Sequence, residues 1–382
     1  MKVDWVVVGA GFTGVTFAER MASAGRRVVI MDQRPHVGGN AYDERNEHGI
    51  LVHRYGPHIF HTNSTIVWSY LSQFTQWRPY EHHVLGMVNE RLIPIPFNFN
   101  SLDALFEPSV ASRLQQRLLV EYGLGKRIPI LKLRESKSNQ IQHLADYIYT
   151  NVFEQYTIKQ WGLLPEELDP SVTGRVAVLI GRDNRYFQDK FQAIPIDGYT
   201  EMFQRMLNHK NISIRLNCEW TNAITTVSPE RILYSGPIDK LMDYRFSPLP
   251  YRSIRFKEET LIKEQHQPVA SINYPGAEDY TRITEQKYLT GQRASVTTLI
   301  TEYPKSHQSG QSNPDYPIPQ EKNRVLYSRY LSAAQNAFPN MTFAGRLADY
   351  QYYNMDQACA RALKLASDHG GPSWANTKLL KS

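Results

Sequence analysis

The chain has 382 residues, with 43 Lys and Arg against 37 Asp and Glu, and a formal net charge of +6. Its hydrophobic fraction of 41% and charged fraction of 21% exclude a disordered or membrane-embedded chain. The length predicts two or three domains around a sizeable core. Basic residues are not concentrated in blocks, which argues against a nucleic-acid partner. Cys218 and Cys359 are too few for a disulfide scaffold or a four-cysteine zinc site, so we predict no bound metal.

Hydrophobic segments and aromatic content narrow the class further. The N-terminus lacks a basic region followed by an apolar stretch, and no run approaches the roughly 18 apolar residues of a membrane span. We therefore expect a soluble, cytoplasmic protein without a membrane span. Tyrosine outnumbers phenylalanine by 23 to 15. Aromatic rings with a polar end often line sites for sugars, bases and phosphates.

The first forty residues predict a βαβ unit. The apolar, β-branched run at residues 5–8 is typical of a strand buried on both faces, and a helical pattern starts near Val15. A second apolar run at residues 28–31 predicts the next strand. It ends at Asp32, about 20 positions after the glycine-rich turn that separates the first strand from the helix.

The glycine-rich turn carries the chemistry of a dinucleotide site. Gly9, Gly11 and Gly14 have the spacing G-x-G-x-x-G. The first allows the tight turn, the second lets a pyrophosphate approach the backbone, and the third lets helix and strand pack closely. The helix N-terminus favours the phosphates, and Asp32 can accept hydrogen bonds from ribose hydroxyls.

This motif alone is compatible with NAD and with FAD. The next segment favours FAD, because a second glycine pair directly after the acidic residue is typical of flavoproteins. In this chain the segment contains Arg34, Gly38, Gly39 and Asn40.

The rest of the chain predicts an α/β framework with a helical insertion. From about 100 to 175 the apolar residues recur at three and four positions, most clearly over 141–156. Short β-rich runs follow between 245 and 303, and the Ser-, Pro- and Gln-rich stretch 306–323 is expected to be irregular. A buried strand at 341–343 and a helix over 355–367 then return to the nucleotide domain.

Six short strings, in this order along the chain, resemble the flavin-dependent UDP-galactopyranose mutases. They occupy residues 55–62 (YGPHIFHT), 156–162 (YTIKQWG), 235–239 (SGPID), 251–253 (YRS), 280–282 (YTR) and 345–356 (GRL to YYNMD). The resemblance covers residues 1 to about 367 and implies an α/β fold with a Rossmann-type FAD-binding domain, a helical-bundle insertion and an antiparallel β-sheet domain. The expected boundaries are 1–80, 190–243 and 324–370 for the FAD domain, 98–175 for the helical domain with a mobile lid near 165–180, and 81–97, 176–189 and 244–323 for the sheet domain.

The resemblance also implies the reaction. The enzyme would be an isomerase that interconverts UDP-galactopyranose and UDP-galactofuranose. Reduced FAD would attack the anomeric carbon, giving a flavin-iminium intermediate. An external electron donor would reduce the FAD, the enzyme would be a homodimer, and the furanose would supply cell-surface polysaccharides such as O-antigen.

Site residues follow from the same resemblance. The catalytic residues implied are Arg175, Arg282, His58 and His61, the two arginines as diphosphate ligands and the two histidines in a flavin-facing loop. An imidazole there could stabilise the anionic reduced flavin or contact the sugar.

The remaining site residues bind cofactor or substrate. The cofactor residues implied are Gly9, Gly11, Gly14, Asp32, Arg34, Gly39, Asn40, His58, Ile59, Arg346, Tyr353 and Met355. The substrate residues are Tyr156 and Trp161 toward the uridine, Tyr186, Tyr316 and Tyr352 toward the phosphates, His82 near the sugar, Arg252 near the flavin or substrate cleft, and Thr157 and Asn354.

One departure keeps the sugar nucleotide open. Asn354 occupies a position where the family usually has Asp. Mutases of TDP-fucopyranose resemble the family closely, so that donor is the first alternative. A flavin oxidoreductase of the amine-oxidase type and a nucleotide-binding protein without catalysis are the others.

Overall fold

A parallel sheet is built around the predicted βαβ unit. The computed structural model describes residues 2–169, 172, 177–223 and 227–373. All neighbouring strands of this sheet run parallel. Their spatial order is β12 (Ile212–Arg215), β2 (Val28–Met31), β1 (Lys2–Val8), β13 (Ser228–Tyr234) and β19 (Met341–Phe343). Every residue of β2 is buried, as its apolar sequence predicts.

Helices cover this sheet and bury its core. They are α1 (Phe12–Ser23), α2 (Thr65–Leu71), α9 (Tyr199–Leu207) and α14 (Met355–Asp368). Helix α1 packs against α14, so the C-terminal helix returns to the nucleotide domain as predicted. Gly14 permits the close approach of α1 to β1, because a Cβ at this position would lie 1.9 Å from the carbonyl oxygen of Gly9.

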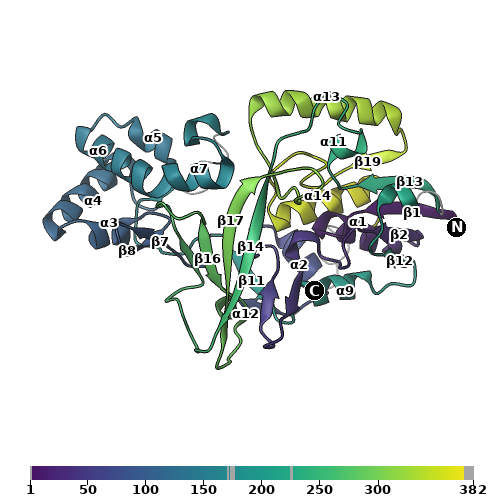
Figure 1. Cartoon of the computed structure of the whole chain (residues 1–382), viewed down its shortest axis with the longest axis horizontal. Helices are drawn as coiled ribbons and strands as arrows, with labels where there is room; N and C mark the ends of the chain where they lie inside the picture. The colour runs from purple at the N-terminus through teal and green to yellow at the C-terminus, as the bar shows by residue number, and fades with distance from the viewer. Residues whose placement is uncertain (1, 170–171, 173–176, 224–226, 374–382) are drawn as a thin grey trace.

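A seven-stranded sheet occupies the middle of the molecule (Figure 1). Its order is β18 (Tyr316–Pro317), β14 (Tyr251–Leu261), β17 (Thr297–Ser306), β16 (Arg282–Glu285), β15 (Ser271–Asn273), β7 (Val84–Val88) and β8 (Arg91–Ile95). Neighbouring strands are antiparallel except β15 and β7, which run parallel.

Helices gather at the end of the molecule opposite the parallel sheet (Figure 1). They are α3 (Phe99–Leu105), α4 (Pro108–Tyr122), α5 (Ile130–Arg134), α6 (Asn139–Ile148), the π-helix η2 (Tyr149–Glu154) and α7 (Gln155–Trp161). The continuous apolar face predicted over 141–156 is thus divided among α6, η2 and α7. A π-helical turn of this kind is often found at functional sites.

The remaining elements are short, with the exception of the 17-residue helix at Glu321–Ala337. They are η1 (Gly39–Ala41), β3 (Asp43–Arg45), β4 (Leu51–His53), β5 (Phe60–Thr62), β6 (Trp77–Pro79), β9 (Arg127–Ile128), η3 (Pro165–Glu167), β10 (Val178–Leu179), β11 (Phe191–Pro195), α10 (Trp220–Ala223), α11 (Ile238–Leu241), α12 (Gln286–Thr290) and α13 (Glu321–Ala337). The stretch 306–323 is less irregular than expected, because β18 pairs with β14 and α13 begins at Glu321. We propose that the three parts are the domains expected from the sequence.

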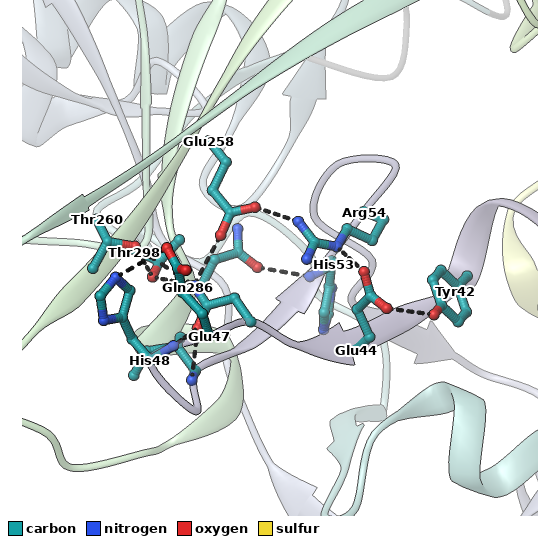
Figure 2. A network of polar contacts seen from close by, with 12 residues as sticks. Tyr42, Glu44, Glu47, His48, His53, Arg54, Glu258, Thr260, Gln286 and Thr298 are labelled. Atoms are coloured by element: carbon teal, nitrogen blue, oxygen red, sulfur yellow. Dashed lines mark hydrogen bonds and ion pairs between the residues drawn. The ribbon is translucent and has the colours of Figure 1, made fainter.

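A polar network fastens the β3–β4 hairpin to the middle sheet (Figure 2). The guanidinium of Arg54 donates to Glu44 Oε1 at 2.7 Å and also to Glu258 of β14. The backbone N–H of His53 donates to Gln286 Oε1 at 3.0 Å. These contacts fix the hairpin, and with it the start of the segment that follows and contains His58.

Candidate active site

A cavity of about 1530 Å³ opens at the carboxyl end of β1. All the predicted cofactor residues except Ile59 line it. The side chain of Ile59 packs instead in a small apolar cluster with Ile194, Ala270 and Leu289, so it does not line the cavity.

The glycine-rich turn fits a dinucleotide. The carboxylate of Asp32 accepts the Ala10 N–H at 2.8 Å and the Arg34 N–H at 2.9 Å, which holds it beside the turn. A Cβ built on Gly11 meets only Gly39 Cα, at 3.7 Å, so the wall there is thin backbone that a pyrophosphate can approach. The residues present therefore fit a dinucleotide such as the FAD that the chain is expected to bind.

A buried carboxylate that sequence analysis missed, that of Asp315, extends a hydrogen-bonded chain of two predicted cofactor residues. Arg34 Nη1 donates to Asn40 Oδ1 at 2.9 Å, and Asn40 Nδ2 donates to Asp315 Oδ1 at 3.3 Å. Asp315 also accepts the Ile254 N–H at 2.8 Å. Burial raises the pKa of Asp315 to about 6, although the backbone hydrogen bond and Arg34 oppose the shift.

Asp315 gives a pH-dependent prediction for the FAD-free protein. Between about pH 4 and pH 6 the folded chain keeps the proton that the unfolded chain has lost, so stability falls as pH rises through this window. Asp315→Asn has no proton to lose in this window, so its free energy of unfolding should not show this fall. Measured in urea, the stability of the variant minus that of the original chain should increase by about 2–3 kcal/mol from pH 4 to pH 7. Parallel curves for the two proteins would contradict the assignment.

His58 is held at three points beside the cavity. Its backbone N–H donates to His53 Nδ1 at 3.1 Å, and its carbonyl accepts the Tyr199 hydroxyl at 3.1 Å. Its Nδ1 lies 2.8 Å from the Gly56 carbonyl, an acceptor, so this nitrogen carries the proton. Burial lowers the pKa of His58 to about 3, and the ring is neutral with Nε2 as an acceptor.

Arg282 lies in a polar group formed by two sheet residues and one helix residue. Its Nη2 donates to the Tyr156 hydroxyl at 3.0 Å and its Nε to Asn273 Oδ1 at 3.1 Å. Its Nη1 is 3.7 Å from Glu302 Oε1. Burial raises the pKa of Glu302, with Arg282 opposing the shift. Sequence analysis missed Glu302, because only the pairing of β16 with β17 brings it to Arg282.

Predicted substrate aromatics form a second group that adjoins the cavity. The ring centroids of Trp161 and Tyr352 are 5.7 Å apart, and those of Tyr316 and Tyr352 are 5.2 Å apart. The guanidinium of Arg346 lies 5.3 Å from the centroids of both tyrosines. Because Arg346 also lines the cavity, it connects the predicted cofactor and substrate residues.

His61 and His82 lie near two consecutive aromatic residues, Tyr186 and Phe187. His61 Nδ1 contacts Asp189 Oδ2 at 2.8 Å, and its ring stacks on Phe187 at 3.7 Å. The His82 ring is 5.8 Å from Tyr186, and burial lowers the pKa of His82 to about 3. His61 does not line the cavity that His58 lines.

Arg252 braces α7. Its Nη2 donates to the Lys159 carbonyl at 2.8 Å, its Nε to the Gln160 carbonyl at 2.9 Å, and its Nη1 to Ser306 Oγ at 3.1 Å. All three contacts are hydrogen bonds to other groups of the protein. Two of them hold the helix that carries Tyr156, Thr157 and Trp161.

Asn354 is the N-cap of α14, with an extended backbone and an N–H that donates to Gln357 Oε1 at 2.9 Å. Asn and Asp are equally good N-caps. We therefore expect Asn354→Asp to change the free energy of unfolding by less than about 0.5 kcal/mol. Asn354→Ala should lose about 1 kcal/mol in the same denaturant titration. A large loss in the Asp variant would show that the amide has another task.

Arg175 lies outside the described residues, as does part of the predicted lid at 165–180. Within the described part of the chain, no cluster of three or more metal-ligating side chains occurs. In the same residues, no helix has the length and apolar character needed to cross a bilayer.

The parallel sheet, the glycine-rich turn and the cavity together define a Rossmann-type dinucleotide-binding enzyme. Its likeness to known flavoenzymes, given next, makes the dinucleotide FAD. Two protein families match parts of the chain. Residues 7–74 match the family described as NAD(P)-binding Rossmann-like domain, and residues 151–352 match the family described as UDP-galactopyranose mutase. The chain belongs to the UDP-galactopyranose mutase family, which is a family of isomerases.

Individual relatives agree with this assignment. A probable UDP-galactopyranose mutase of Klebsiella pneumoniae is 36% identical over 372 residues, covering 95% of this chain and 94% of the relative. A dTDP-fucopyranose mutase of Escherichia coli is 32% identical over 369 residues, covering 94% of this chain and 97% of the relative. The crystal structure of a reduced UDP-galactopyranose mutase shares the fold, with a TM-score of 0.71 at 15% identity over 98% of both chains.

Proposed function

We propose that this chain interconverts UDP-galactopyranose and UDP-galactofuranose with FAD in its reduced state. Family membership supports the reaction. The single structural observation that carries it is the position of Arg346, which lines the cofactor cavity and lies over Tyr316 and Tyr352. A sugar nucleotide that contacts these tyrosines would therefore reach the cofactor.

The reaction exchanges one ring bond of the sugar for another. The bond between C1 and O5 breaks, the bond between C1 and O4 forms, and a proton moves from O4 to O5, so no net oxidation occurs. Reduced FAD supplies the nucleophile for the anomeric carbon.

The chain's own side chains hold the diphosphate. Arg282 stays charged at any working pH and can stabilise the negative charge that develops as the diphosphate leaves. Because Arg282 donates to the Tyr156 hydroxyl, the tyrosine's own proton is available to a phosphate oxygen. Burial raises the pKa of Tyr156 to about 12, which keeps that proton in place at neutral pH.

Trp161 and Tyr156 offer the uridine aromatic surfaces, and His82 lies on the sugar side. His58 supports the loop beside the cofactor as a neutral acceptor. Arg175 and Tyr186 complete the proposed set of diphosphate ligands.

A second sugar-nucleotide substrate, dTDP-fucopyranose, is supported by a specific observation. This is the full-length likeness of the chain to a dTDP-fucopyranose mutase. Steady-state turnover of chemically reduced enzyme with each donor separates the two. We expect a higher kcat/KM for UDP-galactopyranose than for dTDP-fucopyranose. The reverse order would replace the first donor by the second. An oxidoreductase is not proposed, since the family is one of isomerases.

Further properties rest on the family alone. We include in the proposal a cytoplasmic homodimer, an external electron donor that keeps FAD reduced, and a product that supplies cell-surface polysaccharides such as O-antigen.

A further inference from the structure

Lys159 has an unusual environment for a lysine. Its ammonium group donates to four backbone carbonyls of one loop. These belong to Tyr274, Gly276, Glu278 and Tyr280, and the last three lie at 3.1, 3.0 and 3.0 Å. The side chain is half-buried, whereas most lysines keep the ammonium group in water.

The four backbone carbonyls, called the carbonyl ring below, need a cation between them. An ammonium group has three N–H donors, which four acceptors must share. Carbonyl oxygens that converge on one point repel each other unless a positive charge lies between them. Burial lowers the pKa of Lys159, and the carboxylates of Glu278 and Asp279 on the same loop oppose this shift.

The loop that Lys159 binds leads directly into the diphosphate site. It joins β15 to β16 and closes on itself through the Tyr274 N–H and the Thr281 carbonyl, 2.9 Å apart. Arg282 is the first residue of β16, and Asn273, which accepts from its Nε, is the last residue of β15. The position of this arginine therefore depends on the shape of the loop.

Helix α7 contributes the second half of the arrangement. Tyr156 precedes Lys159 by three residues, so the two side chains lie on one face of the helix. The Tyr156 hydroxyl accepts from Arg282 of β16, and the Lys159 ammonium binds the loop that precedes this strand, so the two contacts join α7 to two consecutive segments of the chain. Arg252 binds the backbone carbonyl of the same Lys159.

We propose that Lys159 is a positioning residue for the diphosphate site: as a fixed internal cation it shapes loop 274–281 and thereby sets Arg282 and Tyr156 at the distance that the substrate needs. The inference rests on the proposed function of the Arg282–Tyr156 pair. It assigns Lys159 no contact with substrate or cofactor.

The test uses FAD-loaded enzyme and two variants, Lys159→Ala and Lys159→Met, the second of which keeps the aliphatic stem. We expect both to retain FAD, to bind UDP in calorimetry roughly ten- to hundred-fold more weakly, and to raise KM for UDP-galactopyranose similarly. Methylammonium ions should restore UDP binding to Lys159→Ala, because they fill the vacated carbonyl ring. Lys287→Ala is the matched control, since its ammonium donates to the single carbonyl of Ala294 outside the site, and it should bind UDP normally.

A double variant separates positioning from general stability. In the Arg282→Ala background, Lys159→Ala should weaken UDP binding by clearly less than it does in the original chain, because Arg282, one of the two residues it positions, is gone. Unchanged UDP binding in the single variants, full additivity in the double variant, or loss of FAD from both single variants would overturn the proposal. An original enzyme that binds UDP but converts no nucleotide sugar would contradict the proposed function instead, because binding is the readout here.

Discussion

Replacing Gly14 by Ala should destroy the fold around the cofactor, whereas replacing Gly11 should remove only the cofactor. The added Cβ at position 14 would lie 1.9 Å from the Gly9 carbonyl oxygen, and neither backbone segment can yield without moving β1 or α1. We expect the free energy of unfolding of the FAD-free protein to fall by about 3 kcal/mol or more.

At position 11 the added Cβ meets Gly39 Cα at 3.7 Å, an ordinary contact, so FAD-free stability should stay within about 0.5 kcal/mol. The methyl group would occupy the wall that a pyrophosphate approaches, and FAD affinity should fall roughly ten- to hundred-fold. Urea unfolding and flavin absorbance of the purified variants measure the two effects. Equal loss of stability in both variants, or full FAD binding by Gly11→Ala, would contradict this distinction.

Arg282→Ala should lower kcat/KM for UDP-galactopyranose by roughly 100- to 1000-fold while FAD stays bound. The reason is the loss of the cation that stabilises the departing diphosphate. The same change leaves the carboxylate of Glu302 buried without its ion pair, so the melting temperature should also fall.

Arg282→Lys keeps the charge but loses the planar fork of donors. Its activity should lie between that of the original enzyme and that of Arg282→Ala. Arg293→Ala, an exposed arginine on the loop after α12, serves as the control and should turn over normally. Near-normal turnover by Arg282→Ala would remove this residue from the site.

Local sequence patterns predicted the parts of the fold that depend on neighbours in the chain. The βαβ unit with Gly9, Gly11 and Asp32 is such a part, because its turn, helix start and acidic residue lie within a few tens of residues. The strand at 341–343 and the helix at 355–367 follow from the same short-range signals, and the structure confirms both.

Residues whose partners are distant in sequence could not be predicted in this way. Lys159 meets carbonyls more than a hundred residues away, and Glu302 reaches Arg282 only through strand pairing. Asp315 joins Asn40 across the sheet edge formed by β18. The π-helical turn is equally invisible, since its apolar spacing continues that of the flanking helices. The roles given to the predicted site residues stay predictions until the variants are measured.

The proposed reaction is the rearrangement of a sugar ring by reduced FAD without net oxidation. Its most direct test is incubation of the dithionite-reduced and the oxidised enzyme with UDP-galactopyranose under anaerobic conditions, with chromatography, mass spectrometry and flavin absorbance followed together. We predict that only the reduced enzyme forms a product, that this product has the mass of the substrate and the retention of UDP-galactofuranose, and that the flavin is still reduced at the end. A product of lower mass, or a flavin oxidised in proportion to substrate consumed, would rule out this reaction.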